Sequence, residues 1–263
     1  MLIDFFNLIQ LYETNLTKIR IGHIHDGGYI LLDELNKNTE VVYSFGVADD
    51  ATFESVMYEN YKTPKIRMYD PFVEEIPKFG WRAAYPTLKA EFYKLGLGKI
   101  KILHFNTLES FINENNDFNK NLLLKIDIEN AEWESLLVTP SEVLKNFNQI
   151  IIEFHELNRI SKECSKCIQN INYCSPLNTE ELKVRYDVMK KLTDDFYIFH
   201  AHANNGFPLQ VLESIKVPPI LELSFVRKDL VTVSKINWEY SALDSPNNHN
   251  LSEIHLNFWP FRR

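Results

Sequence analysis

Acidic side chains recur in this sequence at the ends of apolar stretches, where a small ligand could bind. The stretch "VVYSFGVADDATFE" (41–54) is interrupted by one glycine, Gly46, and acidic residues follow it directly. The carboxylates that follow this and later apolar stretches include Asp50, Glu54, Asp70, Asp127 and Glu129. Carboxylates bind ammonium groups, ribose hydroxyls and divalent cations, so these positions predict a site for one of those chemical groups.

The loop at Gly46 has too little glycine for a dinucleotide. A pyrophosphate needs close backbone approach over several residues, which the second and third glycines of G-x-G-x-x-G allow. Val47 and Ala48 follow Gly46 directly and would obstruct that approach. The loop therefore favours a nucleoside ligand without a diphosphate, whose amino-acid end is held by carboxylates and backbone groups. S-adenosylmethionine is such a ligand.

Asp70 and Pro71 end the next apolar stretch, 24 residues after Gly46. An acidic side chain about 20 residues beyond the loop is the usual partner of a ribose, because one carboxylate can accept from both hydroxyls. The alternative is that Asp70 only begins an Asp-Pro turn. After the loop at Gly46, we favour ribose binding.

The stretch "LLLKIDIENAEWESLL" (122–137) places Asp127 and Glu129 on one face of a strand, because side chains alternate with a period of two. These carboxylates could hold the ammonium group of a cofactor, or bind a divalent cation together with oxygen ligands from the next strand. The alternative is that the acids here, Glu132 in particular, only cap the following helix.

Glu153, His155 and His202 end two further apolar stretches, "EFHEL" and "HAHANNG". A histidine titrates near neutral pH and can take the proton of a hydroxyl that is being alkylated. A single histidine in a strand is more often a packing residue. Two histidines at neighbouring strand ends make catalysis or metal binding as plausible as packing.

The elements that position these residues are strands and helices in alternation, which is typical of a sheet covered by helices on both faces. The predicted strands are 41–46, 65–72, 99–105, 122–128, 149–157, 196–202 and 220–228. The segment between the last two contains Gly206 and three prolines, and it leaves little room for a crossover helix. We therefore expect an α/β fold with a seven-stranded, mostly parallel, doubly wound sheet whose last strand is antiparallel.

Two helices are well marked between these strands. Thr139 can cap a helix whose capping box is closed by Glu142. A later helix has one apolar face, formed by Leu182, Tyr186, Met189 and Leu192. We expect one domain over 1–263, with an N-terminal segment (1–40), a cofactor-binding core (41–228) and an aromatic-rich tail (236–263).

The composition excludes several classes of partner. A net charge of −8 spread along 263 residues argues against nucleic acid, whose phosphates need clustered Lys and Arg. The apolar stretches are far shorter than the roughly 20 residues that span a bilayer, and the N-terminus lacks the basic flank of a signal peptide. We expect a cytoplasmic protein without membrane insertion. Its oligomeric state is not predicted.

The three cysteines, Cys164, Cys167 and Cys174, lie together in "ECSKCIQNINYC". An odd number argues against a disulfide framework. A structural zinc needs four ligands, and no further cysteine or histidine is near, so a surface loop with free thiols is the favoured interpretation.

The motifs together resemble the FkbM-like family of S-adenosylmethionine-dependent methyltransferases. The matching stretches are "SFGVADDATFE", "YDPF", "LLLKIDIENAEWESL" and "IIIEFHEL", preceded by "RIGHIHDGGYILLDEL" (20–35). The family commonly has Glu-Gly-Ala-Glu where this chain has "ENAE" (129–132), and asparagine tolerates the left-handed conformation that glycine would adopt.

The resemblance implies a role for each matching residue. It places Ser44, Gly46 and Asp50 or Glu54 at the methionine end of the cofactor. It places Asp70 at the ribose and Asn106 with Thr107 near the adenine. The full cofactor-binding set is Ser44, Gly46, Val47, Asp50, Glu54, Asp70, Pro71, Asn106, Thr107, Asp127, Ile128 and Glu129.

The resemblance further implies methyl transfer to an oxygen of a saccharide, either a hydroxyl or a carboxylate, in glycan, polysaccharide or nucleotide-sugar biosynthesis. The candidate catalytic residues are His155, His202 and Asp127, and Asp127 with Glu153 could bind Mg²⁺ or Mn²⁺. One alternative is a methyltransferase fold without activity that recruits a partner through its tail. Another is a nicotinamide-dependent oxidoreductase, which the loop glycines disfavour.

Two segments could contribute to an acceptor site. Asp26 and Tyr29 belong to a hairpin-type turn by composition, and the resemblance raises the chance that one of them faces the acceptor. The aromatic residues Trp81 and Tyr85 could stack on a sugar ring or cover the core, and the sequence does not decide between these roles.

Overall fold

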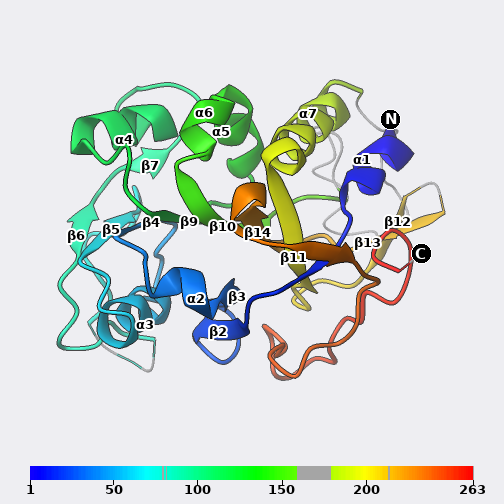
Figure 1. Cartoon of the computed structure of the whole chain (residues 1–263), viewed down its shortest axis with the longest axis horizontal. Coiled ribbons are helices and arrows are strands. Elements are labelled where there is room, and N and C mark those ends of the chain that lie inside the picture. The colour runs from blue at the N-terminus through cyan, green and yellow to red at the C-terminus, as the bar shows by residue number, and fades with distance from the viewer. Residues whose placement is uncertain (79, 81, 159–178, 213, 263) are drawn as a thin grey trace.

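The computed structural model describes residues 1–78, 80, 82–158, 179–212 and 214–262. Its centre is a seven-stranded sheet in the order β6-β5-β4-β9-β10-β14-β11 (Figure 1). The strands are β4 (Val41–Phe45), β5 (Lys65–Tyr69), β6 (Glu91–Tyr93), β9 (Leu122–Ile126), β10 (Phe147–Phe154), β11 (Phe196–Ala203) and β14 (Leu221–Arg227). Within this sheet β14 runs antiparallel to both neighbours and the remaining pairs are parallel. The architecture is mixed α/β and Rossmann-like.

Side chains of the strands alternate between two apolar cores, one on each face of the sheet. Tyr43 and Phe45 belong to one core and Val42 to the other, as the period of two requires. The first core is covered by α1 (Leu2–Leu8), α4 (Leu108–Asn115), α5 (Glu132–Val138), α6 (Ser141–Leu144) and α7 (Thr179–Asp195). The second is covered by α3 (Thr52–Asn60) and a hairpin of β2 (Lys18–Gly22) and β3 (Gly28–Leu32). Figure 1 shows these two groups on opposite sides of the sheet.

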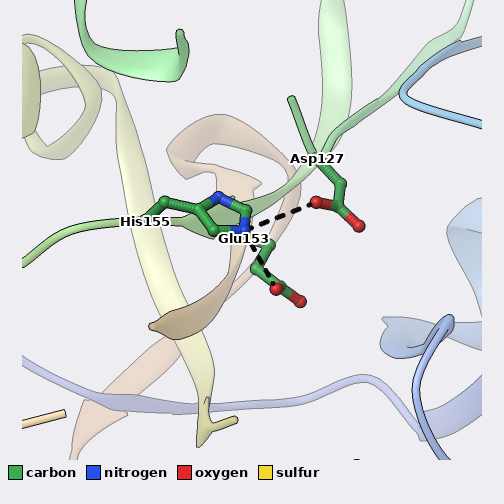
Figure 2. Close-up of side chains that lie close together, drawn as sticks. All are labelled: Asp127, Glu153 and His155. Carbon is green, nitrogen blue, oxygen red and sulfur yellow. Dashed lines mark ion pairs between the residues drawn. The ribbon is translucent and has the colours of Figure 1, made fainter. Parts of the chain in front are cut away.

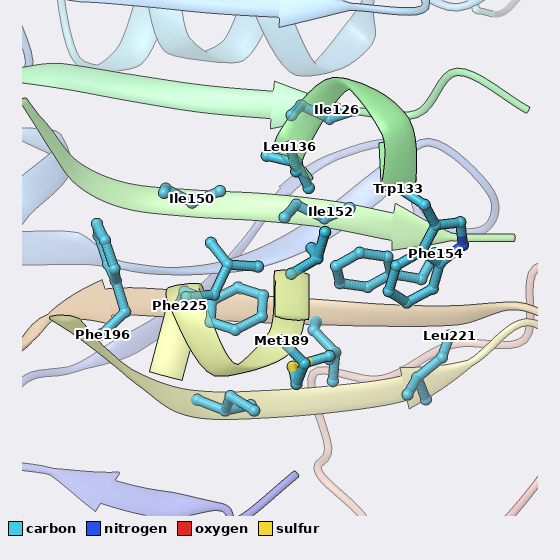
Figure 3. Packing of buried hydrophobic residues seen from close by; sticks show 14 of the residues in the cluster. Ile126, Trp133, Leu136, Ile150, Ile152, Phe154, Met189, Phe196, Leu221 and Phe225 are labelled. Carbon is cyan, nitrogen blue, oxygen red and sulfur yellow. The ribbon is translucent and has the colours of Figure 1, made fainter. Parts of the chain in front are cut away.

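The first core is rich in aromatic side chains (Figure 3). Trp133 of α5 stacks on Phe154 of β10, with ring centroids 4.3 Å apart. Met189 of α7 and Phe225 of β14 are also fully buried in this core. Burial of side chains of this size contributes about 1.5–3 kcal/mol each, so this layer holds α5 and α7 on the sheet.

Shorter elements complete the fold. They are β1 (Tyr12–Thr14), α2 (Asp33–Asn36), β7 (Gly96–Leu97), β8 (Phe105–Asn106), β12 (Gln210–Leu212), β13 (Ile215–Val217), the 3₁₀ helix η1 (Lys228–Leu230) and β15 (Val233–Lys235). The tail beyond β15 packs on the first core, where Trp238, Leu256 and Phe261 are buried. Its aromatic residues therefore contribute to the fold.

Most of the predicted strands are confirmed, but the strand predicted at 99–105 is wrong. The strand of the sheet that follows β5 in the chain is β6, which pairs parallel with β5. It has only three residues, and the apolar pattern did not reveal it. In the predicted stretch, Ile100, Ile102 and Leu103 are more than half exposed, and Leu103 has a φ of 50°. These residues form a turn outside the sheet, so their apolar character does not reflect burial.

The predicted capping box is also wrong. The helix after Thr139 is the short α6, which has no side-chain cap, and Thr139 Oγ1 donates instead to the carbonyl of Ser135 at 2.8 Å. The crossover from β9 to β10 contains α5 as well. The predicted apolar face of α7 is confirmed by the burial of Leu182, Met189 and Leu192, and the predicted antiparallel pairing of the last two strands is also confirmed.

None of the described helices combines the length and the apolar character that a bilayer span requires. Cys164, Cys167 and Cys174 lie outside the described residues, as does Trp81.

Candidate functional site

A cavity of about 550 Å³ opens at the carboxyl ends of four neighbouring strands. The residue that follows each strand closely lines it: Gly46 after β4, Asp70 after β5, Asp127 after β9 and His155 after β10. This edge is where open α/β sheets bind ligands. The volume lies within the range of roughly 300–1,000 Å³ that is usual for small-molecule sites.

The wall of the cavity is strongly acidic. Among the described residues, seven carboxylates line it, against the basic side chains of Arg82 and Lys125 and the imidazole of His155. The carboxylates are Asp26, Asp49, Asp50, Asp70, Asp127, Glu129 and Glu153. A wall of this charge attracts a cationic ligand and repels phosphate groups.

Gly46 is required by a close approach of two loops. Its φ is 84°, and a Cβ built on it would lie 1.6 Å from the carbonyl oxygen of Asp127. The two loops are also joined by Lys125, whose Nζ donates to the carbonyl of Gly46 at 2.8 Å. A larger residue at 46 would push the ends of β4 and β9 apart and displace the residues there that line the cavity.

Asp70 organises the loop that follows β4. Its Oδ2 accepts from the backbone N–H groups of Val47 (3.1 Å) and Ala48 (2.9 Å). Its Oδ1 accepts from the backbone N–H groups of Phe72 (2.8 Å) and Val73 (3.2 Å). The side chain therefore also begins the Asp-Pro turn that the sequence analysis gave as the alternative. A carboxylate has about four acceptor positions, so a ribose hydroxyl would compete with these backbone donors.

Asp127, Glu153 and His155 form a compact cluster at the other side of the cavity (Figure 2). The imidazole Nε2 of His155 lies 3.4 Å from Glu153 and 3.8 Å from Asp127. The Nδ1 of the same ring is 3.0 Å from Glu132, and Tyr29 donates to the second oxygen of Asp127 at 3.1 Å. The cluster therefore joins residues of β10, of the loop after β9, and of the hairpin.

The carboxylates of this cluster change the protonation of His155. Burial alone lowers its pKa, but hydrogen bonds to Glu132 and Glu153 outweigh burial and raise the pKa to about 11. Burial also raises the pKa of Glu153 well above its usual value, and that of Asp127 in the same direction. An imidazolium has no lone pair with which to accept a proton, so this arrangement does not favour His155 acting alone as a general base.

Ser44 and Glu54 lie beneath the loop at Gly46 and do not line the cavity. Ser44 donates a hydrogen bond to Glu54, and both side chains are fully buried. Burial raises the pKa of Glu54, and nearby Lys125 opposes this rise. Among the predicted loop residues, Gly46, Val47 and Asp50 line the cavity.

Asn106 and Thr107 also lie outside the cavity lining. Thr107 caps α4 by accepting from Ser110 at 3.2 Å, and Asn106 accepts from the N–H of Thr107. The cavity wall at this end is formed by their neighbour Phe105, with Leu97 and Pro71. These apolar surfaces, rather than the two polar side chains, face the cavity.

His202 lies within β11 and does not line the cavity. Its Nδ1 is 3.2 Å from Glu222, and its Nε2 is 3.3 Å from Glu253. Burial lowers its pKa, but the two glutamates outweigh burial and raise the pKa to about 10. The remaining predicted residues Asp127, Ile128, Glu129 and His155 do line the cavity.

Several lining residues escaped the sequence analysis. Lys125 is a charged residue inside the fully buried strand β9, and that contrast was a usable signal. Arg82 lies 3.4 Å from Asp26 and 3.7 Å from Asp49, and no motif marked it. Asn204 donates to Glu153 at 3.4 Å. Asp26 and Tyr29, considered for the acceptor, both line the cavity, whereas Tyr85 does not.

Comparison of the chain with protein-family models, with curated proteins and with solved structures finds no match. The resemblance of its motifs to FkbM-like methyltransferases therefore stays a prediction.

Proposed function

We propose that the protein is an S-adenosylmethionine-dependent O-methyltransferase that acts on a saccharide or a similar hydroxylated acceptor. The observation that carries the proposal is the acid-lined cavity at the strand ends, closed by a turn with one glycine. S-adenosylmethionine carries a sulfonium and an ammonium group and no phosphate. It therefore suits a wall of seven carboxylates, which would repel the pyrophosphate of a nicotinamide dinucleotide.

The two ends of the cavity differ in a way that fits the two ends of this cofactor. Pro71, Leu97 and Phe105 form an apolar wall for the adenine. At the loop after β4, the Oδ2 of Asp50 is buried, has no hydrogen-bond partner among the described atoms and lies 3.8 Å from Nε of Arg82, whereas its Oδ1 accepts from the N–H of Thr52 at 2.8 Å. A buried carboxylate oxygen of this kind is a candidate partner for the ammonium group.

The acceptor would bind at the mouth of the cavity. Asp26, Arg82 and Asn204 line both this cavity and a neighbouring surface pocket that also contains His249. Carboxylate, guanidinium and amide groups together offer donors and acceptors for sugar hydroxyls. The enzyme would act mainly by aligning the acceptor oxygen with the methyl group. A carboxylate acceptor needs no base, whereas the proton of a hydroxyl acceptor would pass to the carboxylate of Asp127, whose pKa burial raises.

Thermal unfolding with and without ligand tests the proposal. At 100 times its dissociation constant, S-adenosylmethionine should add about 2.7 kcal/mol of stability. For a chain of this size that raises Tm by roughly 5–10 °C. S-adenosylhomocysteine should also raise Tm, and NADH should not. An Asp50→Asn variant should bind S-adenosylmethionine at least about tenfold more weakly, whereas Asn at the 85% exposed neighbour Asp49 should change little.

The outcomes separate the competing functions. No rise in Tm at millimolar S-adenosylmethionine would refute the proposal, and a rise with NADH would favour an oxidoreductase. Binding without transfer of a labelled methyl group to any saccharide of a cell extract would favour the inactive binding protein.

A further inference from the structure

The imidazole of His155 is surrounded by carboxylates on both of its nitrogens. The four carboxylates of Asp127, Glu129, Glu132 and Glu153 each lie 3.0 to 3.8 Å from a ring nitrogen. Three of them face Nε2, and Glu132 alone faces Nδ1. One imidazole therefore faces four carboxylates, and this corner of the cavity is rich in possible ligand atoms.

The spacing of the cluster suits a metal ion. Asp127, Glu153 and His155 each offer one ligand atom, and these three atoms all lie within 4.8 Å of one another. Ligands held at about 2.1 Å from a metal lie about 3 Å apart in cis and about 4.2 Å apart in trans. The distances from Nε2 to the two carboxylates, 3.4 and 3.8 Å, fall between these limits.

The contacts of His155 match those of a metal-binding histidine. Glu132 is fully buried, and its Oε1 lies 3.0 Å from Nδ1. A metal ion would replace the proton on Nε2, which faces the two carboxylates, while the Nδ1 proton stays directed to Glu132. A ligating histidine usually donates its other N–H to a carboxylate in this way.

Glu153 provides an independent observation. Its side chain is 5% exposed, and among the described atoms its Oε2 has no hydrogen-bond partner. The same residue lines the cavity. A buried carboxylate oxygen without a partner costs free energy, and a cation between Glu153, Asp127 and His155 would remove that cost.

We propose that Asp127, Glu153 and His155 form a binding site for one divalent transition-metal ion, with Mn²⁺ as the representative ion. The set contains one nitrogen and at least two carboxylate ligands. Mg²⁺ prefers oxygen ligands and keeps several waters, whereas an imidazole ligand favours the transition metals. Such an ion would also act as a Lewis acid for an acceptor oxygen. The site does not depend on the proposed function, because it can be measured without cofactor or acceptor.

Electron paramagnetic resonance of Mn²⁺ tests the site on the whole chain after treatment with a chelator. Binding removes the six-line signal of the free ion, and we expect one ion per chain. Glu153→Gln and His155→Gln should each weaken binding at least about tenfold. The matched control is Asp49→Asn, which removes the same charge from the same cavity and should change binding by about twofold or less. Glu153→Gln keeps the size of the side chain and an acceptor oxygen for Asn204, so this variant is expected to fold even if His155→Gln does not.

Competition with Mg²⁺ tests the role of the nitrogen ligand. The wild-type site should hold Mn²⁺ against at least about tenfold more Mg²⁺. Glu132 acts as a positioning residue, so Glu132→Gln should weaken Mn²⁺ binding about tenfold and leave Mg²⁺ affinity unchanged. Absence of Mn²⁺ binding at millimolar concentration, or equal losses in Glu153→Gln and Asp49→Asn, would overturn the proposal. The second result would show only attraction to an acidic surface.

Discussion

Replacement of Asp70 tests whether this residue supports the loop after β4 or serves only a ligand. The side chain is 6% exposed and accepts four backbone hydrogen bonds, two through each oxygen. An asparagine keeps one acceptor oxygen and replaces the other with a donor. We expect its oxygen to remain on Val47, which is buried, and its amide group to face Phe72 and Val73.

Asp70→Asn and Asp70→Ala should lower the free energy of unfolding by different amounts. In Asp70→Asn the N–H groups of Phe72 and Val73 lose their acceptor but can turn to solvent. We therefore expect the free energy of unfolding to fall by about 1–2 kcal/mol. In Asp70→Ala the N–H of Val47 also loses its partner inside the protein. Each such charge-assisted bond contributes about 1.5–3 kcal/mol, so the loss should reach about 3–4 kcal/mol.

Urea unfolding without ligand measures these differences, and Asp49→Asn is the control. Asp49 lies in the same loop and is 85% exposed, so its substitution should change the free energy of unfolding by about 0.5 kcal/mol or less. A different pattern would refute the reasoning: unchanged stability in both Asp70 variants, together with weaker S-adenosylmethionine binding, would show that Asp70 serves the ligand alone.

Two further substitutions test the fold around the cavity. Gly46→Ala should destabilise the chain by more than about 3 kcal/mol, because strain at a φ of 84° adds to a contact of 1.6 Å with the Asp127 carbonyl. The control is Gly80→Ala, because Gly80 has a φ of 92° and a Cβ there would have no described atom within 4 Å. This variant should lose only about 1 kcal/mol of unfolding free energy in urea. Equal losses in the two variants would contradict the close approach at Gly46. For His202, whose pKa is raised from 6.5 to about 10, the stabilisation from Glu222, Glu253 and Asp244 is complete below pH 6.5 and declines as the pH rises through about 10. The stability difference between wild type and His202→Gln should therefore shrink over this pH range, and a constant difference would show that the charge of His202 contributes nothing.

The fold was predictable where long apolar stretches form central strands. β4, β9 and β10 are buried along their whole length, so each produces a run of mostly apolar residues in the sequence. β6 was missed because it has three half-buried residues at the edge of the sheet. The stretch at 99–105 was misassigned because apolar residues at an exposed turn resemble a strand in composition alone.

The site was predictable to the extent that it follows from strand ends. Gly46, Asp127 and His155 were identified because parallel strands bring their carboxyl ends to one edge. The sequence could not show that His202, within β11, is held by Glu222 and Glu253. Nor could it reveal Arg82, whose place at the cavity depends on a loop without a recognisable motif.

The structure also distinguishes the roles of acidic residues that the sequence analysis assigned to one site. Asp70 has all its acceptor positions engaged by the backbone, so it acts mainly on the loop. Asp50 and Glu153 line the same cavity, and each keeps one buried oxygen without a hydrogen-bond partner among the described atoms. Buried polar atoms are rarely left in this state unless a ligand or ion completes them. Asp50 belongs to the loop after β4 and Glu153 to the cluster with His155. Each of the two oxygens therefore supports one proposed cationic ligand of the same cavity: the ammonium group of the proposed cofactor at Asp50 and the proposed metal ion at Glu153.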